Sequence, residues 1–193
     1  MKRDIRFHRE RAEKYVAGLS FQDKMKILYG TFDDMRELGL FFIFFTGEAA
    51  HGVQARHDQS FDLGEPVCTT VFSNPIGMAA SFDKELMHSI GNVVGTEMRS
   101  LVNEFRHNGL LSFAPTVDME RDPRWGRNEE AYGEDPHLTS RMAGEYILGM
   151  AGDDEKYVRC GATLKHFYGN NVEQDRYSID SVMPRDLQED YYQ

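Results

Sequence analysis

The stretch Leu110-Leu-Ser-Phe-Ala-Pro-Thr116 decides the organisation of this chain, because it directly follows a long helical pattern. Across residues 83–105, apolar side chains recur at helical spacing, Asp83 stands at the start, and Asn108-Gly109 supply the stop. A strand-length apolar run after such a helix predicts one strand of a buried parallel sheet.

Similar strand and helix patterns lie before and after the predicted helix at 83–105 and the predicted strand at 110–116. Apolar runs at residues 38–46, 76–80 and 161–167 predict three further strands. Asp135-Pro136 predicts the start of a helix that continues to about residue 150. This alternation of strands and helices indicates an α/β fold with right-handed βαβ units. The sheet is either an open, doubly wound one or an arc of a barrel.

The two ends of the chain are expected to be helical. Residues 7–29 predict two helices with a break at residues 18–20, where Ser20 can cap the second helix. Pro184 predicts the start of a last, acidic helix up to residue 193.

Composition excludes several classes of partner. The chain has 193 residues, is 40% hydrophobic and 28% charged, and carries a formal charge of -10. We expect a globular domain that binds neither nucleic acid nor an anionic membrane surface. The charged first ten residues do not match an export signal, so a cytoplasmic location is expected. The most apolar run, residues 38–45, is shorter than the roughly 20 residues of a transmembrane helix.

No metal or cofactor is expected. Cys68 and Cys160 are far apart and outside any C-x-x-C pattern, which indicates two core thiols. Glu48, His51 and His166 are conceivable metal ligands, but they lack the spacing of an H-E-x-x-H site. The glycine patterns of phosphate loops and dinucleotide sites are absent from the sequence.

Polar residues gather where three of the predicted strands end, which is where parallel α/β folds place ligand groups. Glu48 follows the first strand, an arginine-rich loop over residues 118–135 follows the third, and Lys165-His166 end the fourth. A lysine at the end of an apolar strand either serves a ligand or belongs to a structural ion pair. The loop arginines are also consistent with salt bridges, and Trp125 with either a sugar-stacking platform or a buried plug.

Six ordered motifs together resemble the amino-terminal (β/α)8 barrel domain of glycoside hydrolase family 3, in a truncated form. The motifs are Glu48-Ala-Ala-His-Gly-Val53, residues 70–83 around Ile76-Gly-Met-Ala-Ala80, Arg121-Asp-Pro-Arg-Trp-Gly-Arg127, Tyr132-Gly-Glu-Asp-Pro136, Lys165-His-Phe167 and Arg185-Asp-Leu187. The resemblance implies an exo-acting, retaining β-glycosidase that removes terminal β-D-xylosyl or β-D-glucosyl residues. The Glu48 context is similar to the β-xylosidase branch.

The same resemblance implies the roles of four residues. Glu48, Arg127, Lys165 and His166 correspond to the groups that hold the sugar in the −1 subsite. Their carboxylate, guanidinium, ammonium and imidazole groups are directional partners for sugar hydroxyls. The substrate implied is an oligosaccharide or another β-glycoside.

The catalytic carboxylates implied by the family are not expected within this chain. The nucleophile would be an aspartate late in the barrel, beyond residue 193, and the acid/base usually comes from a following domain. Asp180 follows the Lys-His strand directly, so we interpret it as a loop carboxylate.

A complete barrel of this kind needs about 250 residues. We therefore interpret residues 1–193 as an incomplete domain, with a leading helical segment at 1–37 and about four βα units at 38–193.

Two other interpretations remain open. The chain is alternatively a non-catalytic half-barrel or gene remnant, which associates with itself or with a complementary chain through open sheet edges. A third interpretation is an unrelated open-sheet enzyme that uses Glu48, Lys165 and His166 for acid/base chemistry.

Overall fold

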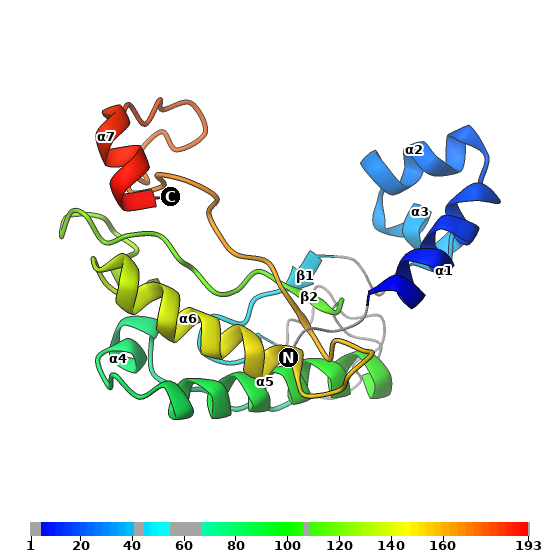
Figure 1. Cartoon of the computed structure of the whole chain (residues 1–193), viewed down its shortest axis with the longest axis horizontal. Helices are drawn as coiled ribbons and strands as arrows, with labels where there is room; N and C mark the ends of the chain where they lie inside the picture. Colours follow the sequence, from blue (N-terminus) through cyan, green and yellow to red (C-terminus); the bar gives the residue numbers. More distant parts are fainter. Residues whose placement is uncertain (1–4, 41–44, 55–66, 106–108, 193) are drawn as a thin grey trace.

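The computed structural model describes residues 5–40, 45–54, 67–105 and 109–192 (Figure 1). In chain order, the elements are α1 (Arg6–Ala17), α2 (Phe21–Tyr29), α3 (Phe32–Glu37), β1 (Phe45–Gly47), α4 (Pro75–Ala79), α5 (Lys84–Phe105), β2 (Leu111–Ser112), the 3-10 helix η3 (Asn128–Glu130), α6 (Pro136–Ala151), β3 (Gly161–Ala162), α7 (Arg185–Leu187) and the π-helical turn η4 (Gln188–Tyr192).

A parallel sheet with the order β1-β2-β3 confirms the α/β class for the described residues. Leu111 of β2 pairs with Phe45 of β1 on one side and with Gly161 of β3 on the other. Further along, Thr116 and Lys165 form an isolated parallel bridge. Glu48 and Lys165 therefore follow the carboxyl ends of β1 and β3, the two strands that flank β2 in one sheet.

The strands are shorter than the apolar runs that predicted them. Within the run at 38–46, Leu38 and Gly39 form the turn that ends α3, where the Leu38 N–H donates to the carbonyl of Asp34 at 3.2 Å. Residues 41–44 of that run lie outside the described residues. Regular pairing therefore begins only at Phe45 in the described part of the run.

The strand expected at residues 76–80 was wrong, because this segment forms helix α4. Pro75 occupies the first turn, where its missing N–H and fixed φ suit a helix. Met78 and Ala79 are buried against the core. A short apolar run fits a buried strand and a buried helical turn equally well, and the proline favours the turn.

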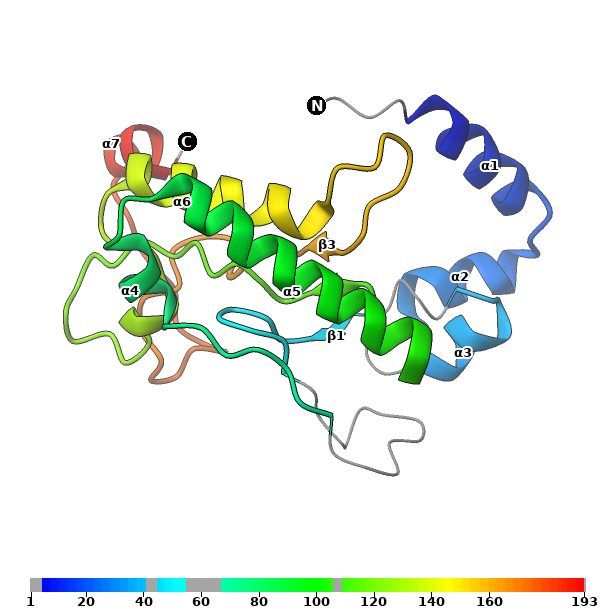
Figure 2. The same cartoon turned by 90° about the horizontal axis from the view of Figure 1, so that it is seen from below.

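Helices α5 and α6 confirm the helices predicted over residues 83–105 and from Pro136 to about residue 150. The carboxylate of Asp83 accepts from the Leu86 N–H at 2.9 Å, and that of Asp135 accepts from the His137 N–H at 2.8 Å. The two helices lie side by side and cover one face of the sheet (Figures 1 and 2). Methionines and tyrosines fill the core between them, including Met87, Met98, Met142, Tyr146 and Met150.

Glycine permits the close approach of these two helices. A Cβ atom at Gly149 of α6 would lie 2.1 Å from the carbonyl oxygen of His88 in α5. At Gly91 of α5, it would lie 2.2 Å from the carbonyl oxygen of Tyr146. The two backbones are therefore in direct contact, and any larger residue would force them apart.

The amino-terminal helices stand apart from the α5–α6 pair (Figure 1). The predicted break is confirmed, since Ser20 caps α2 by accepting from the Asp23 N–H at 3.1 Å. Thr31 and Asp34 form a capping box at the start of α3. His8 contacts the rest of the molecule through a 2.7 Å hydrogen bond with the carbonyl of Lys156.

The two cysteines differ from each other. Cys160 is buried as expected, and burial raises the pKa of its thiol to about 12. The prediction for Cys68 was wrong, because this residue is exposed on the irregular segment before α4. No helix in the described part of the chain has the length and apolar character that crossing a bilayer requires.

Candidate functional site

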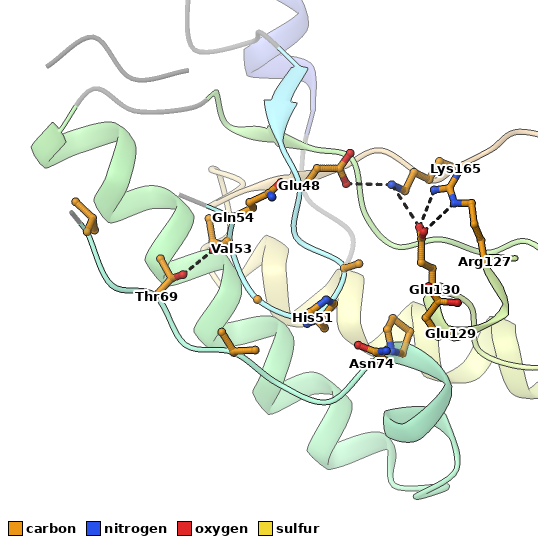
Figure 3. Close-up of a pocket in the computed structure, with 15 residues that line it drawn as sticks. Glu48, His51, Val53, Gln54, Thr69, Asn74, Arg127, Glu129, Glu130 and Lys165 are labelled. Carbon is orange, nitrogen blue, oxygen red and sulfur yellow. Dashed lines mark hydrogen bonds and ion pairs between the residues drawn. The ribbon is translucent and has the colours of Figure 1, made fainter. Parts of the chain in front are cut away.

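A cavity of about 620 Å³ opens beyond the carboxyl ends of the strands (Figure 3). Four segments form its walls, namely the loop after β1, the segment that leads into α4, the region around η3 and the segment after β3. The lining residues are Glu48, Ala50, His51, Gly52, Val53, Gln54, Val67, Thr69, Val71, Asn74, Pro75, Arg127, Glu129, Glu130 and Lys165.

Backbone hydrogen bonds fix the shape of the wall after β1. The Gln54 N–H donates to the carbonyl of Glu48 at 2.8 Å, which closes the loop on itself. The Phe72 N–H donates to the carbonyl of His51 at 2.8 Å. The hydroxyl of Thr69 donates to the carbonyl of Val53 at 2.6 Å, so the segment before α4 is held against the loop after β1.

Lys165 brings its ammonium group to this cavity from the segment after β3. Its backbone carbonyl accepts from the Val117 N–H at 2.8 Å, which fixes the strand end. The ammonium donates to Glu48 Oε2 at 3.0 Å and lies 4.0 Å from Glu130 Oε2. Only 14% of the lysine side chain is exposed, so these two carboxylates offset the cost of burying its charge.

Arg127 lies beside Lys165 and is held by Glu130. Its Nε and Nη2 donate to the two carboxylate oxygens of Glu130 at 2.7 and 2.6 Å, a bidentate pair. This hydrogen bonding raises the pKa of Arg127 and holds the pKa of Glu130 below its usual range. Both groups are therefore charged at neutral pH.

His166 takes a different position from the other three predicted residues. It does not line the cavity, and its Nδ1 pairs with Asp118 Oδ2 at 2.7 Å. Its backbone N–H also donates to Asp118 Oδ1 at 3.3 Å. The Asp118 side chain is 3% exposed, so the imidazole is attached to a buried carboxylate next to the cavity.

The remaining arginines of the loop have structural partners. Arg124 pairs with Asp122 at 2.6 Å on the surface, and Arg121 donates to Asn171 Oδ1 at 2.9 and 2.8 Å. Trp125 is buried, and its Nε1 donates to Glu173 Oε1 at 3.1 Å. Of its two possible roles, the structure therefore favours the plug over the stacking platform.

Sequence reasoning assigned no role to two residues that organise this site. Glu130 and Asp118 were visible as members of a polar loop, but so were several other acids. The informative signal was spacing, since Arg127 and Glu130 are three residues apart and η3 places them on one side of a tight turn. The contact between Asp118 and His166 spans 48 residues, and no local pattern predicts it.

The candidate metal ligands do not converge. Glu48 and His51 line the cavity, whereas the His166 ring is engaged with Asp118. Across the described ranges, no group of three His, Cys, Asp or Glu side chains is arranged to hold a metal ion. The Nδ1 atom of His51 is buried without a hydrogen-bond partner.

A family model described as the glycosyl hydrolase family 3 N-terminal domain matches residues 48–191. A probable exo-1,4-beta-xylosidase, bxlB, of Aspergillus terreus is 35% identical over 188 residues, which are 94% of this chain and 24% of the relative. Beta-xylosidase/alpha-L-arabinofuranosidase 2 of Medicago sativa subsp. varia is 33% identical over 95% of this chain and 24% of its own length. The chain thus spans about a quarter of the length of these relatives.

Solved structures show the same likeness. The exo-beta-xylosidase XlnD, in complex with a xylobiose aziridine probe, matches with a TM-score of 0.73 and 33% identity over 88% of this chain and 22% of the other. Beta-glucosidase 3B from Thermotoga neapolitana, in complex with glucose, matches with a TM-score of 0.54 and 28% identity over 65% of this chain and 16% of the other.

Proposed function

The chain belongs to glycoside hydrolase family 3, and we propose that it supplies part of the −1 sugar subsite of an exo-acting, retaining β-glycosidase. The observation that carries this proposal is the convergence of Glu48, Arg127 and Lys165 on one cavity. These residues come from three separate segments, and each offers a charged hydrogen-bonding group for a sugar hydroxyl.

The proposed substrates are terminal β-D-xylosyl or β-D-glucosyl residues, with xylosides preferred. Relatives that match over nearly the whole chain are named exo-1,4-beta-xylosidase and xylan 1,4-beta-xylosidase. The structural likeness to a xylosidase, with a TM-score of 0.73, also exceeds that to a glucosidase, at 0.54.

Sugar binding would use the Glu48–Lys165 pair as an exchangeable contact. Glu48 accepts hydrogen bonds and Lys165 donates them, so a hydroxyl that inserts between them meets both a donor and an acceptor. The Glu48 side chain is 40% exposed, so its carboxylate can turn towards a ligand without a large desolvation cost. His166 would complete the subsite from the side.

The nucleophile and the acid/base are proposed to lie outside residues 1–193. A retaining hydrolysis needs two carboxyl groups about 5 to 5.5 Å apart across the scissile bond. Asp180 is exposed and does not line the cavity, which supports its interpretation as a loop carboxylate. The chain by itself is accordingly expected to bind sugars without hydrolysing them.

The test is a titration of the 193-residue chain with methyl β-D-xyloside and methyl β-D-glucoside, observed by protein NMR. We expect shifts at residues of the cavity, weaker binding of the glucoside, and a loss of affinity of about tenfold in Lys165→Met, which removes one charged hydrogen bond. Arg185→Met, which lies outside the cavity, is the matched control. An equal loss of glycoside affinity in Arg185→Met and in Lys165→Met would contradict the proposal.

Hydrolysis is tested separately with an aryl β-xyloside. No turnover is expected from the chain. Turnover that disappears in Asp180→Ala would instead identify Asp180 as the nucleophile.

Self-association is a second candidate function, and exposed apolar side chains favour it. Phe167, Tyr177 and Val182 have relative exposures of 101%, 91% and 84%. These residues follow β3, where additional strands of a barrel or a second copy of the chain would cover them.

A further inference from the structure

One carboxylate lies between the two cations of the cavity. Both oxygens of Glu130 accept from Arg127, at 2.7 and 2.6 Å, and Oε2 also faces the Lys165 ammonium at 4.0 Å (Figure 3). Its neighbour Glu129 lines the same cavity, yet none of the ion pairs among the described residues includes it. The two adjacent acids therefore have different environments.

The two sides of the Arg127 guanidinium are held to different degrees. Glu130 takes the edge formed by Nε and Nη2, whereas Nη1 lies 3.7 Å from Glu173 Oε1. That oxygen of Glu173 already accepts from Trp125 at 3.1 Å. Glu130 therefore fixes the orientation of the planar fork, and donors on Nη1 remain available to a ligand.

Lys165 needs a second counter-charge when a ligand binds. Its hydrogen bond to Glu48, at 3.0 Å, is the contact with which a sugar hydroxyl competes. With 14% of its side chain exposed, the ammonium would lose part of its compensation if Glu48 turned away. Glu130 stays in place, because its bidentate pair with Arg127 holds it there.

We propose that Glu130 is the positioning residue of this cavity, which holds Arg127 in its ligand-binding orientation and balances Lys165 when Glu48 turns to the substrate. The proposal rests on the proposed function in one respect, namely that the ligand is a neutral sugar. The positioning role itself concerns Arg127 and can be measured without any ligand.

The first measurement is the Arg127 side-chain Nε–H resonance in the 15N-labelled chain, assigned with Arg127→Lys. In the wild type, this proton is hydrogen-bonded to Glu130, so slow exchange with solvent is expected. Glu130→Gln should abolish the slow exchange, whereas Glu129→Gln, the matched control in the same turn, should preserve it. Slow exchange that survives in Glu130→Gln overturns the proposal.

The second measurement is the affinity for methyl β-D-xyloside. We expect a loss of about tenfold in Glu130→Gln and less than about twofold in Glu155→Gln, an exposed acid outside the cavity, because only the first leaves a charged donor without its partner. Equal losses in the two variants overturn the proposal. Circular dichroism of each variant shows whether the fold is intact.

Glu130→Asp covers the case in which Glu130→Gln fails to fold. The aspartate keeps the charge on a shorter side chain, so faster Nε–H exchange together with reduced affinity is expected. Faster exchange with unchanged affinity overturns the proposal. If the wild type binds neither glycoside, the proposed function fails, while the exchange rates of Arg127 still decide whether Glu130 positions it.

Discussion

Glu130 shows how one residue couples two charged partners from different segments. Arg127 directly precedes η3, three residues before Glu130, whereas Lys165 comes from the segment after β3. Charge-assisted, bidentate hydrogen bonds are stronger than neutral ones and also fix geometry. The organisation of the cavity therefore depends on a glutamate that holds its cations in place.

This pairing predicts a pH dependence of stability. Arg127 holds the pKa of Glu130 below its ordinary value of 4.5, so the carboxylate is stabilised in the folded state. The contribution is complete above that value and is lost as the pH falls through the lower, folded-state pKa. Urea unfolding at a series of pH values should show a stability difference between wild type and Glu130→Gln that narrows below about pH 4.5.

Glu129→Gln is the control, because it adds an amide to the same turn without breaking the Arg127 pair. A difference between wild type and Glu130→Gln that widens on acidification would contradict the pairing.

At this scale, the sequence motifs selected three charged residues that share one cavity, but not Glu130, the partner of Arg127. Glu48, Arg127 and Lys165 were selected through motifs, and they line one cavity. Their ion pairs depend on the packing of segments up to 117 residues apart, as between Glu48 and Lys165. Loop composition could not distinguish Glu130 from Glu129, because the two differ only in the direction in which η3 points them.

Among the elements, the contact between α5 and α6 is the most sensitive to substitution. Gly149→Ala would place a Cβ 2.1 Å from the carbonyl oxygen of His88. We expect a destabilisation of about 2 kcal/mol or more, because backbone atoms cannot yield as a flexible side chain does. Chemical denaturation followed by circular dichroism measures the change in the free energy of unfolding.

Gly144→Ala in the same helix is the matched control. A Cβ at Gly144 would meet nothing within 4 Å, so the alanine should stabilise the helix by about 0.5–1 kcal/mol. Similar destabilisation by both substitutions would show that the two helices do not touch at Gly149.

The elements also show where sequence patterns succeed and fail. Helices α2, α5 and α6 were predictable because their caps and apolar spacing are local features. The strands have only two or three paired residues in the described ranges, and pairing depends on segments far away in the chain. The helix at α4 was missed because five apolar and small residues carry no period that separates a strand from a helical turn.

For the whole molecule, the apolar side chains after β3 predict association between copies. Light scattering at increasing protein concentration should show species larger than a monomer, because burial of exposed apolar surface favours contact. Val182→Lys should reduce this association, since it places a charge among these exposed side chains. Leu28→Lys, in the separate helix α2, is the control. A monomer at every concentration would exclude this contact.

The methionines in the core between α5 and α6 make separation of these two helices measurable by chemical oxidation. Met87, Met98, Met142 and Met150 are buried there, each with at most 1% exposure, whereas Met25 is 37% exposed. Peroxide converts an accessible thioether to the sulfoxide, a mass increase that peptide mass spectrometry locates. Oxidation of the four core sulfurs therefore requires these helices to separate. The rate of oxidation then reports how often the two helices separate, without any added label.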